Sequence, residues 1–384
     1  MTLFLVTFLG LYGSMHLYVF VRVRSAFSMG SSTSILLALW MIFGIIAPIL
    51  VRMGEHFDHE RTAVAIAWPG YIWMGCLFIF VSLLLAIDIL RSVAWLFAHF
   101  SGQSLLILSS PRITCEIALV LATVASAYAL FEAHHLHVEQ VTIPTEKLPS
   151  TIPTLRIVQI SDVHIGLLYR ESRLKALLDA IREARPDILV STGDLVDGRL
   201  SREDTLSHQN RLAALLASVK PAYGSYAVTG NHDFYAGLDQ ALSFTRACGF
   251  KVLRNETVSL PQGISITGVD DPAGQNMGFR ATKPPESQLL NSLSQNTFKL
   301  FLKHRPLVQP ESDGYFDLQL SGHVHKGQIF PFNLLVRLQF PIPCGTTVTK
   351  AGSLIHVSRG TGTWGPPMRL FAPPEITIID LVRK

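Results

Sequence analysis

Four long apolar runs in the first third of the chain constrain its fold more than any other feature. They are roughly Leu3–Val21, Ser34–Val51, Ile72–Leu90 and Ile113–Phe131. Each has about 18–20 residues, the length that a helix needs to cross a hydrocarbon core of ~30 Å. Helices of a soluble bundle normally carry a polar stripe, and these runs do not. We therefore predict an all-α transmembrane region of four helices within residues 1–133.

The composition of the whole chain agrees with a large membrane segment. Hydrophobic residues make up 49% of the 384 residues and charged residues only 16%, whereas a soluble domain has about 25% charged residues. The net charge of +4 comes from dispersed basic residues, so nucleic acid is not expected as a partner, and no protein partner is predicted. The four cysteines form no CxxC pair, so neither a thiolate zinc site nor a disulfide scaffold is indicated.

The arginines between the apolar runs bear on the orientation of the chain in the cell membrane. The first run has neither the basic n-region nor the cleavage site of a signal peptide, so we expect a retained helix and a multi-pass protein. Four crossings place both ends of the chain on one side. The first and third loops are flanked by Arg22, Arg24, Arg91 and Arg112. The positive-inside bias favours these loops in the cytoplasm, which places the C-terminal part on the extracytoplasmic side.

The sequence changes character after the fourth run. Residues 134–153 contain His134, His135, His137 and two prolines, and we interpret them as a juxtamembrane linker. From residue 154 to 384, short β-branched runs alternate with helical patterns, which predicts an α/β domain with its ligand site at the carboxyl ends of parallel strands. Strands are expected at Arg156–Ile160, Asp187–Ser191, Ser225–Val228, Ile264–Val269, Phe298–Leu302, Leu318–Leu320, Leu354–Ser358 and Glu375–Leu381, and helices at Arg170–Ala184, Thr205–Ser218 and Gly237–Ala247.

Five of these strands are each followed by side chains that bind metals. The segments read Asp162-Val163-His164, Gly193-Asp194-Leu195-Val196-Asp197, Gly230-Asn231-His232-Asp233, Lys303-His304-Arg305 and Gly322-His323-Val324-His325. Any one of them alone is a weak signal, since a single DxH or HxH pair is usually a surface feature. Carboxylate, amide and imidazole groups at five equivalent strand ends, however, predict a metal centre at one edge of the sheets.

This ordered set resembles the calcineurin-like metallophosphoesterase superfamily over about residues 155–384. The later segments Ser358–Gly362, Met368–Leu370 and Pro373–Ile376 resemble its membrane-associated bacterial phosphodiesterase branch. The resemblance implies a four-layer α/β/β/α sandwich of two mixed sheets, with the metals above the sheet edges. We therefore expect the catalytic domain to be a metallophosphoesterase sandwich that follows the transmembrane region.

The resemblance also implies a dinuclear site. The first metal would be bound by Asp162, His164 and His325, the second by Asn231, His304 and His323, and Asp194 would bridge both. Mixed nitrogen and oxygen ligands suit Mn, Fe or Zn, and the sequence does not choose among these divalent ions. Two such ions hold a hydroxide for in-line attack on phosphorus. His232 would be the general acid for the leaving group, with Asp197 orienting its imidazole, although Asp197 as an exposed turn residue stays open.

These inferences predict a membrane-anchored hydrolase of phosphodiester or pyrophosphate bonds. Its substrate is a phosphate ester, and the anchor among membrane lipids favours a lipid-linked one. One alternative is a UDP-diacylglucosamine-type lipid pyrophosphatase on the cytoplasmic face, and another is a non-catalytic membrane sensor with the same fold. A nuclease would need a basic stripe, and a transporter would need charge pairs within the membrane; the sequence shows no clear example of either.

Some residues near the motifs keep two interpretations. Gly198 and Asp233 depart from the GDxxDRG and GNHE patterns of protein phosphatases, so protein dephosphorylation is not expected. Arg305, Arg359, Arg369 and Lys326 are candidate phosphate contacts or ordinary surface residues. The pairing of Cys248 with Cys344 is also left open.

Overall fold

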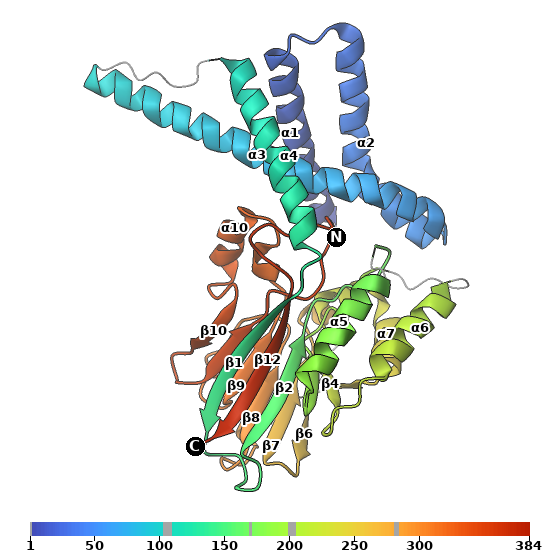
Figure 1. Cartoon of the computed structure of the whole chain (residues 1–384), viewed down its shortest axis with the longest axis vertical. Coiled ribbons are helices and arrows are strands. Elements are labelled where there is room, and N and C mark those ends of the chain that lie inside the picture. The colour runs from blue at the N-terminus through green and yellow to red at the C-terminus, as the bar shows by residue number, and fades with distance from the viewer. Residues whose placement is uncertain (1, 103–109, 169–170, 199–204, 280–283) are drawn as a thin grey trace. The chain divides into compact units, whose positions relative to one another are not determined.

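The computed structural model describes residues 2–102, 110–168, 171–198, 205–279 and 284–384 (Figure 1). Arg170, the expected first residue of a helix, lies outside these ranges. The chain divides into two compact units. The first consists of residues 1–131 with the segment 365–370, and the second of residues 132–364 with residues 371–384.

The first unit contains four long helices at the positions of the apolar runs. They are α1 (Thr2–Ala26), α2 (Ser31–His56), α3 (Glu60–Ser101) and α4 (Pro111–Glu132). All four are long and apolar enough to cross a membrane. With 42 residues, α3 is much longer than the run Ile72–Leu90 and extends over about 63 Å at 1.5 Å per residue. The predicted run stops short of both helix ends, because charged and polar residues such as Glu60, Arg61, Arg91 and Ser92 interrupt the apolar sequence there.

A polar network joins helices of the first unit. The Arg22 guanidinium of α1 lies 2.8 Å from the Asp88 carboxylate of α3, and the Tyr18 hydroxyl donates to the same carboxylate at 2.6 Å. The Trp73 indole N–H donates to His16 Nε2 at 3.0 Å. The sequence showed no clear charge pair within the membrane, and the structure adds a pair between Arg22 and Asp88, which lie toward the ends of their apolar runs. Arg22 and Asp88 meet only because α1 and α3 pack together, which hydropathy does not reveal.

The second unit is built on two six-stranded sheets. The first sheet has the order β1 (His137–Thr145), β12 (Glu375–Arg383), β2 (Thr154–Ile160), β3 (Ile188–Ser191), β4 (Ser225–Ala227) and β5 (Lys251–Val252). The second has the order β10 (Gly345–Val348), β11 (Leu354–Val357), β9 (Leu318–Ser321), β8 (Phe298–Leu302), β7 (Ile264–Gly268) and β6 (Glu256–Leu260). Strands β2 to β5 are parallel, as are β7, β8, β9 and β11.

The sheets pack against each other and carry helices on their outer faces. Ile157 and Val190 of the first sheet share a buried cluster with Ile266 and Leu300 of the second. The outer face of the first sheet is covered by α5 (Glu171–Ala184), α6 (Thr205–Ala217) and α7 (Asn231–Ala247). The outer face of the second sheet contacts α9 (Glu286–Asn291) and α10 (Phe332–Gln339). The short helix α8 (Ala273–Asn276) follows β7 in the sequence, and the 3₁₀ turn η1 (His325–Gly327) follows β9. The predicted α/β sandwich is confirmed.

The expected linker contains a strand. Residues 137–145 form β1, which pairs in parallel with β12 along its whole length (Figure 1), from His137 beside Glu375 to Thr145 beside Arg383. Ile143 and Thr145 are buried, whereas Pro144 between them is exposed, which an edge strand tolerates. The histidines and prolines of this segment hid its alternation, so the folded domain includes part of the segment 134–153.

Candidate metal centre

The predicted ligands follow the carboxyl ends of strands from both sheets, and their backbone is unusual. Five of the seven have a left-handed φ: Asp162 (51°), His164 (52°), Asp194 (52°), His323 (72°) and His325 (47°). Such backbone is uncommon for residues other than glycine and costs about 1–3 kcal/mol each. Backbone hydrogen bonds help to hold it, since the N–H of Asp162 donates to Gly193 and that of His164 to Asp194. Strain therefore concentrates at this point of the domain.

Two glycines allow loops to approach these ligands. A Cβ at Gly230 would lie 2.1 Å from Asp194 Oδ1, and a Cβ at Gly322 would lie 2.2 Å from Asp162 Oδ2. Any side chain at either position would collide with a carboxylate. The glycines of the GNHD and GHxH segments are thus required by close packing around the site.

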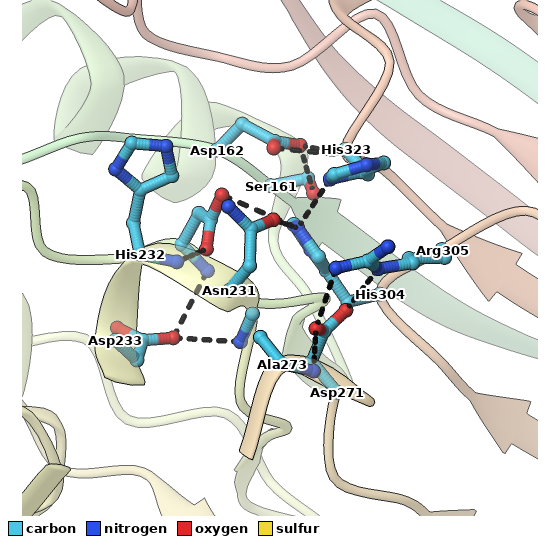
Figure 2. A network of polar contacts seen from close by, with 12 residues as sticks. Ser161, Asp162, Asn231, His232, Asp233, Asp271, Ala273, His304, Arg305 and His323 are labelled. Carbon is cyan, nitrogen blue, oxygen red and sulfur yellow. Dashed lines mark hydrogen bonds and ion pairs between the residues drawn. The ribbon is translucent and has the colours of Figure 1, made fainter. Parts of the chain in front are cut away.

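One group of ligands gathers around Asp162. Donor atoms of Asp162, His164 and His325 all lie within 4.8 Å of one another. The Nε2 atoms of His164 and His325 are 3.1 Å apart, and His325 Nε2 is 3.4 Å from Asp162 Oδ1. The Ser161 hydroxyl and the His323 N–H donate to the Asp162 carboxylate at 2.5 and 3.0 Å. Figure 2 shows both of these contacts with Asp162.

The second group surrounds the buried imidazole of His304. Its Nδ1 lies 2.8 Å from the carbonyl oxygen of Thr192, which can only accept, so Nδ1 carries a proton. In a neutral ring Nε2 then presents a lone pair to Asp194 Oδ2 at 3.2 Å, Asn231 Oδ1 at 3.2 Å and His323 Nδ1 at 3.1 Å. The two oxygen atoms face this lone pair with no proton between them, so the arrangement favours a cation there, either a metal ion or a second proton on the ring. These donors therefore fit a divalent metal.

Burial and charge set the protonation of these ligands. Burial lowers the pKa of His164 and of His323 to about 3, which leaves their lone pairs available to a metal. Burial also opposes protonation of His304, but the adjacent Asp194 carboxylate outweighs it and raises the pKa of His304 to about 10. Burial opposes ionisation of Asp162, yet the neighbouring imidazoles hold its pKa well below the usual range. The Asp194 carboxylate thus favours the positively charged form of the His304 imidazole at neutral pH.

His232 and Asp197 meet as predicted. His232 lies in the first turn of α7, and its Nδ1 is 3.0 Å from Asp197 Oδ1. The His232 N–H donates to Asp194 Oδ1 at 2.8 Å, which ties the helix to the second ligand group. His164, Asp197 and His232 also form a third group that could hold a metal ion. The aromatic rings of Tyr235 and Trp364 flank His232 at 5.6 and 5.5 Å.

The candidate phosphate contacts are mostly engaged elsewhere. The Arg305 guanidinium forms a two-pronged ion pair with Asp271, at 2.7 and 3.0 Å (Figure 2). Arg359 pairs with Glu139 and Glu375. Arg369 is fully buried and belongs to the first unit, where its N–H donates to the carbonyl of Ala129 at 2.9 Å. Lys326 is half-buried next to His325.

Several supporting residues were missed by the sequence analysis. Asp233 Oδ2 accepts the N–H groups of Gly230 and Asp194 at 2.8 and 3.1 Å, and burial, aided by the Asp194 charge, raises the pKa of Asp233 to about 7. Asp271 could have been found, because it follows the strand β7 as the other site residues follow theirs. The hydroxyl of Ser161 had no signal beyond its position before Asp162.

Comparison with known proteins places this site in a family. Residues 155–327 match the family model of the calcineurin-like phosphoesterases. An uncharacterized metallophosphoesterase of Aquifex aeolicus (strain VF5) is 39% identical over 267 residues, which cover 69% of this chain and 99% of that protein. The chain belongs to the calcineurin-like metallophosphoesterase family. It is accordingly a metal-dependent phosphoester hydrolase, and divalent metal ions are its cofactor.

Other metallophosphoesterases extend the similarity toward the helices. A zebrafish (Danio rerio) transmembrane protein with metallophosphoesterase domain is 30% identical over 330 residues, covering 82% of this chain and 74% of that protein. Residues 154–384 alone cannot account for this coverage, so the similarity includes residues of the N-terminal part. The uncharacterized metallophosphoesterase YkuE of Bacillus subtilis (strain 168) is 34% identical over 266 residues, which cover 65% of this chain and 87% of that protein. With its four apolar helices, this metallophosphoesterase is a membrane protein.

Proposed function

We propose that this metallophosphoesterase is anchored by four membrane-spanning helices and hydrolyses phosphodiester or pyrophosphate bonds with two divalent metal ions. The observation that carries the proposal is the convergence of Asp194, Asn231 and His323 on the lone pair of His304 Nε2. Asp162, His164 and His325 form a separate group of donors. Two groups on either side of Asp194 suit two ions.

The residues divide the binding of the ions as the family pattern implies. One ion would be held by Asp162, His164 and His325 and the other by Asn231, His304 and His323, with Asp194 shared. When bound, the ions neutralise charge on the phosphoryl group and lower the pKa of a water molecule. Ser161, Thr192 and the backbone of His323 fix the orientation of the ligands through their hydrogen bonds.

His232 is proposed to supply the proton to the leaving group. The Asp197 carboxylate can only accept, so the proton of their hydrogen bond lies on His232 Nδ1. That bond fixes the plane of the imidazole, and a protonated ring transfers the proton of its other nitrogen to the leaving oxygen. His232 also belongs to the third group that could hold a metal ion, with His164 and Asp197. A metal ligand is therefore the competing role, and the metal content of a His232 variant decides between ligand and general acid.

The helices bear on the substrate and on the side of the membrane. A domain joined to membrane helices meets phosphate esters of lipids more often than dilute soluble ones, so we propose a lipid-linked substrate. Positive-inside bias from Arg22, Arg24, Arg91 and Arg112 supports an extracytoplasmic catalytic domain. A cytoplasmic domain would instead favour the lipid pyrophosphatase alternative.

The test measures metal content and hydrolysis in the same preparations. The purified chain should contain about two divalent ions and should hydrolyse a diester or a lipid pyrophosphate faster than a monoester. Asp194→Asn should lose metal and activity together, whereas Asp239→Asn, on the exposed side of α7, should lose neither. An Asp194→Asn chain with full metal and normal turnover contradicts the shared ligand. A metal-loaded parent that cleaves none of the substrates supports the non-catalytic sensor instead.

A further inference from the structure

Helix α10 presents an unusual apolar surface. It begins at Phe332, five residues after the η1 turn ends, and the segment before it carries His323 and His325. None of the side chains of α10 is buried. The exposed side chains are Phe330 (44%), Phe332 (45%), Leu334 (55%), Leu335 (58%) and Leu338 (83%), here called the α10 surface. Soluble surfaces rarely expose so many large apolar side chains together.

The opposite side of α10 explains why the helix forms in this position. Val336 is partly buried and packs against Val324, Phe340 and Ile355. The Phe340 ring, directly after the helix, also contacts the ring of His323 at 5.2 Å. The helix is therefore fixed to the core by one side and exposes leucines on the other.

The apolar surface continues toward the catalytic imidazole. Phe330 contacts the exposed Phe371 ring at 6.0 Å. The Gln328 side chain binds both main-chain polar groups of Trp364, at 2.8 and 2.9 Å. The Trp364 ring, 49% exposed, in turn lies 5.5 Å from His232. Two exposed aromatic rings thus lie next to residues 328–330 by these contacts, and one of them, Trp364, lies beside the proposed general acid.

The stretch of sequence that contains α10 has basic side chains but no acidic ones. Between Asp317 and Glu375 the sequence contains no Asp or Glu, while its basic residues are Lys326, Arg337, Lys350, Arg359 and Arg369. Arg337 lies in the last turn of α10 and is exposed, as is Lys350. Leucine and phenylalanine beside exposed basic residues are typical of helices that lie in the interface of an anionic bilayer.

The connection to the membrane helices is short. Helix α4 ends at Glu132 and β1 begins at His137, and a domain on so short a connection to a membrane helix meets lipids at high effective concentration. We propose that the α10 surface docks into the interface of this bilayer and that Phe371 and Trp364 guide a lipid-borne phosphoester to His232. The catalytic part of this proposal rests on the proposed function, whereas the docking does not.

The docking test uses the full chain reconstituted in vesicles of phosphatidylglycerol and phosphatidylcholine. An environment-sensitive fluorophore is attached at Leu338→Cys, with Met277→Cys, also exposed (49%), as the matched control. The parent chain treated with the same reagent gives the background of the native cysteines. Lipids with brominated acyl chains should quench the label at 338 several-fold more than the label at 277, with blue-shifted emission only at 338.

Two results would overturn docking. Equal weak quenching at both positions, with water-like emission, would place the α10 surface in solvent. In the second result, quenching by lipid disappears as the protein-to-lipid ratio rises, and energy transfer appears between the labels of two chains. The α10 surface would then bind a second copy of the chain and not the bilayer. The same label in an Asp194→Asn chain should still be quenched, because docking needs no catalysis.

Activity measurements separate docking from the chemistry. Replacing Leu334, Leu335 and Leu338 with serine should leave turnover of a water-soluble diester unchanged and reduce turnover of a phosphoester lipid in the vesicles by tenfold or more. Met277→Ser should change neither. If the label enters the bilayer but no substrate is cleaved, docking stands and the proposed function fails. If the diester is cleaved but the serine variant handles both substrates like the parent, the guidance of lipid fails and the proposed function stands.

Discussion

Replacement of Gly230 by alanine tests the close packing around the proposed shared ligand. The added Cβ would lie 2.1 Å from Asp194 Oδ1, 2.6 Å from Asp194 N and 2.7 Å from Asp194 Cγ. Ordinary carbon–oxygen contact needs about 3.4 Å, so one side must retreat by roughly 1 Å. The backbone of Gly230 is extended (φ −104°, ψ −176°), which alanine adopts easily. The perturbation is therefore steric and not a strain of the backbone.

Asp194 has little room to retreat. It is 2% exposed, its Oδ1 accepts the His232 N–H at 2.8 Å, and its own N–H donates to Asp233 at 3.1 Å. A shift of the carboxylate would also change its distance of 3.2 Å from His304 Nε2. Because a displacement of about 1 Å can cost 10²-fold in rate, we expect kcat/KM of Gly230→Ala to fall by about 10²-fold. This corresponds to about 2.7 kcal/mol of transition-state stabilisation.

The assay combines three measurements on full-length protein. Metal content by mass spectrometry should fall, kcat/KM for a water-soluble diester should fall as stated, and overpacking should lower the free energy of unfolding by about 1–3 kcal/mol. Gly30→Ala is the control, because its Cβ meets nothing within 4 Å, and it should match the parent. Full metal content with turnover within about twofold of the parent in Gly230→Ala would refute this reasoning.

Three further predictions concern the acid, the metal and the orientation. His232→Ala should keep its metal while kcat falls by about 10²–10⁴-fold, with a smaller loss for leaving groups that need no proton; loss of metal would make His232 a ligand. Metal affinity, measured by titration calorimetry, should rise about tenfold per pH unit across neutral pH, because the pKa of about 10 at His304 means that a metal must displace a proton there; a flat profile would contradict that proton count. Protease added outside intact cells or spheroplasts should cleave within residues 154–384, and protection until lysis would reverse the proposed topology.

Elements of the fold that depend on local pattern could be predicted from the sequence. The buried strand at Phe298–Leu302 was predicted to the residue, since an apolar run between polar loops has few alternatives. The seven candidate ligands could be named because the segments after five predicted strands resemble the motifs of the calcineurin-like family, and their binding of metal stays a prediction. Strand β1 was missed, since Pro144 and several histidines make a weak strand pattern, and only its pairing with β12 reveals it.

Features that depend on contacts between distant segments could not be predicted. The Arg22–Asp88 pair joins residues 66 positions apart, and hydropathy treats the two as separate helix ends. Asp233 was read only as a departure from the phosphatase pattern, whereas its carboxylate accepts two backbone N–H groups behind Asp194. The exposure of α10 was equally hidden, because leucine and phenylalanine in a sequence are ordinarily assigned to the core.

The commitment of arginines to carboxylates has a consequence for catalysis. Arg305 follows the proposed ligand His304, yet its guanidinium already holds Asp271 by two hydrogen bonds, and Arg359 is paired with Glu139 and Glu375. Each of these carboxylates offsets the positive charge that a phosphate would otherwise meet. Charge on the phosphoryl group must then be balanced mainly by the metal ions. Hydrolysis should therefore depend far more steeply on the occupancy of the metal centre than on either arginine.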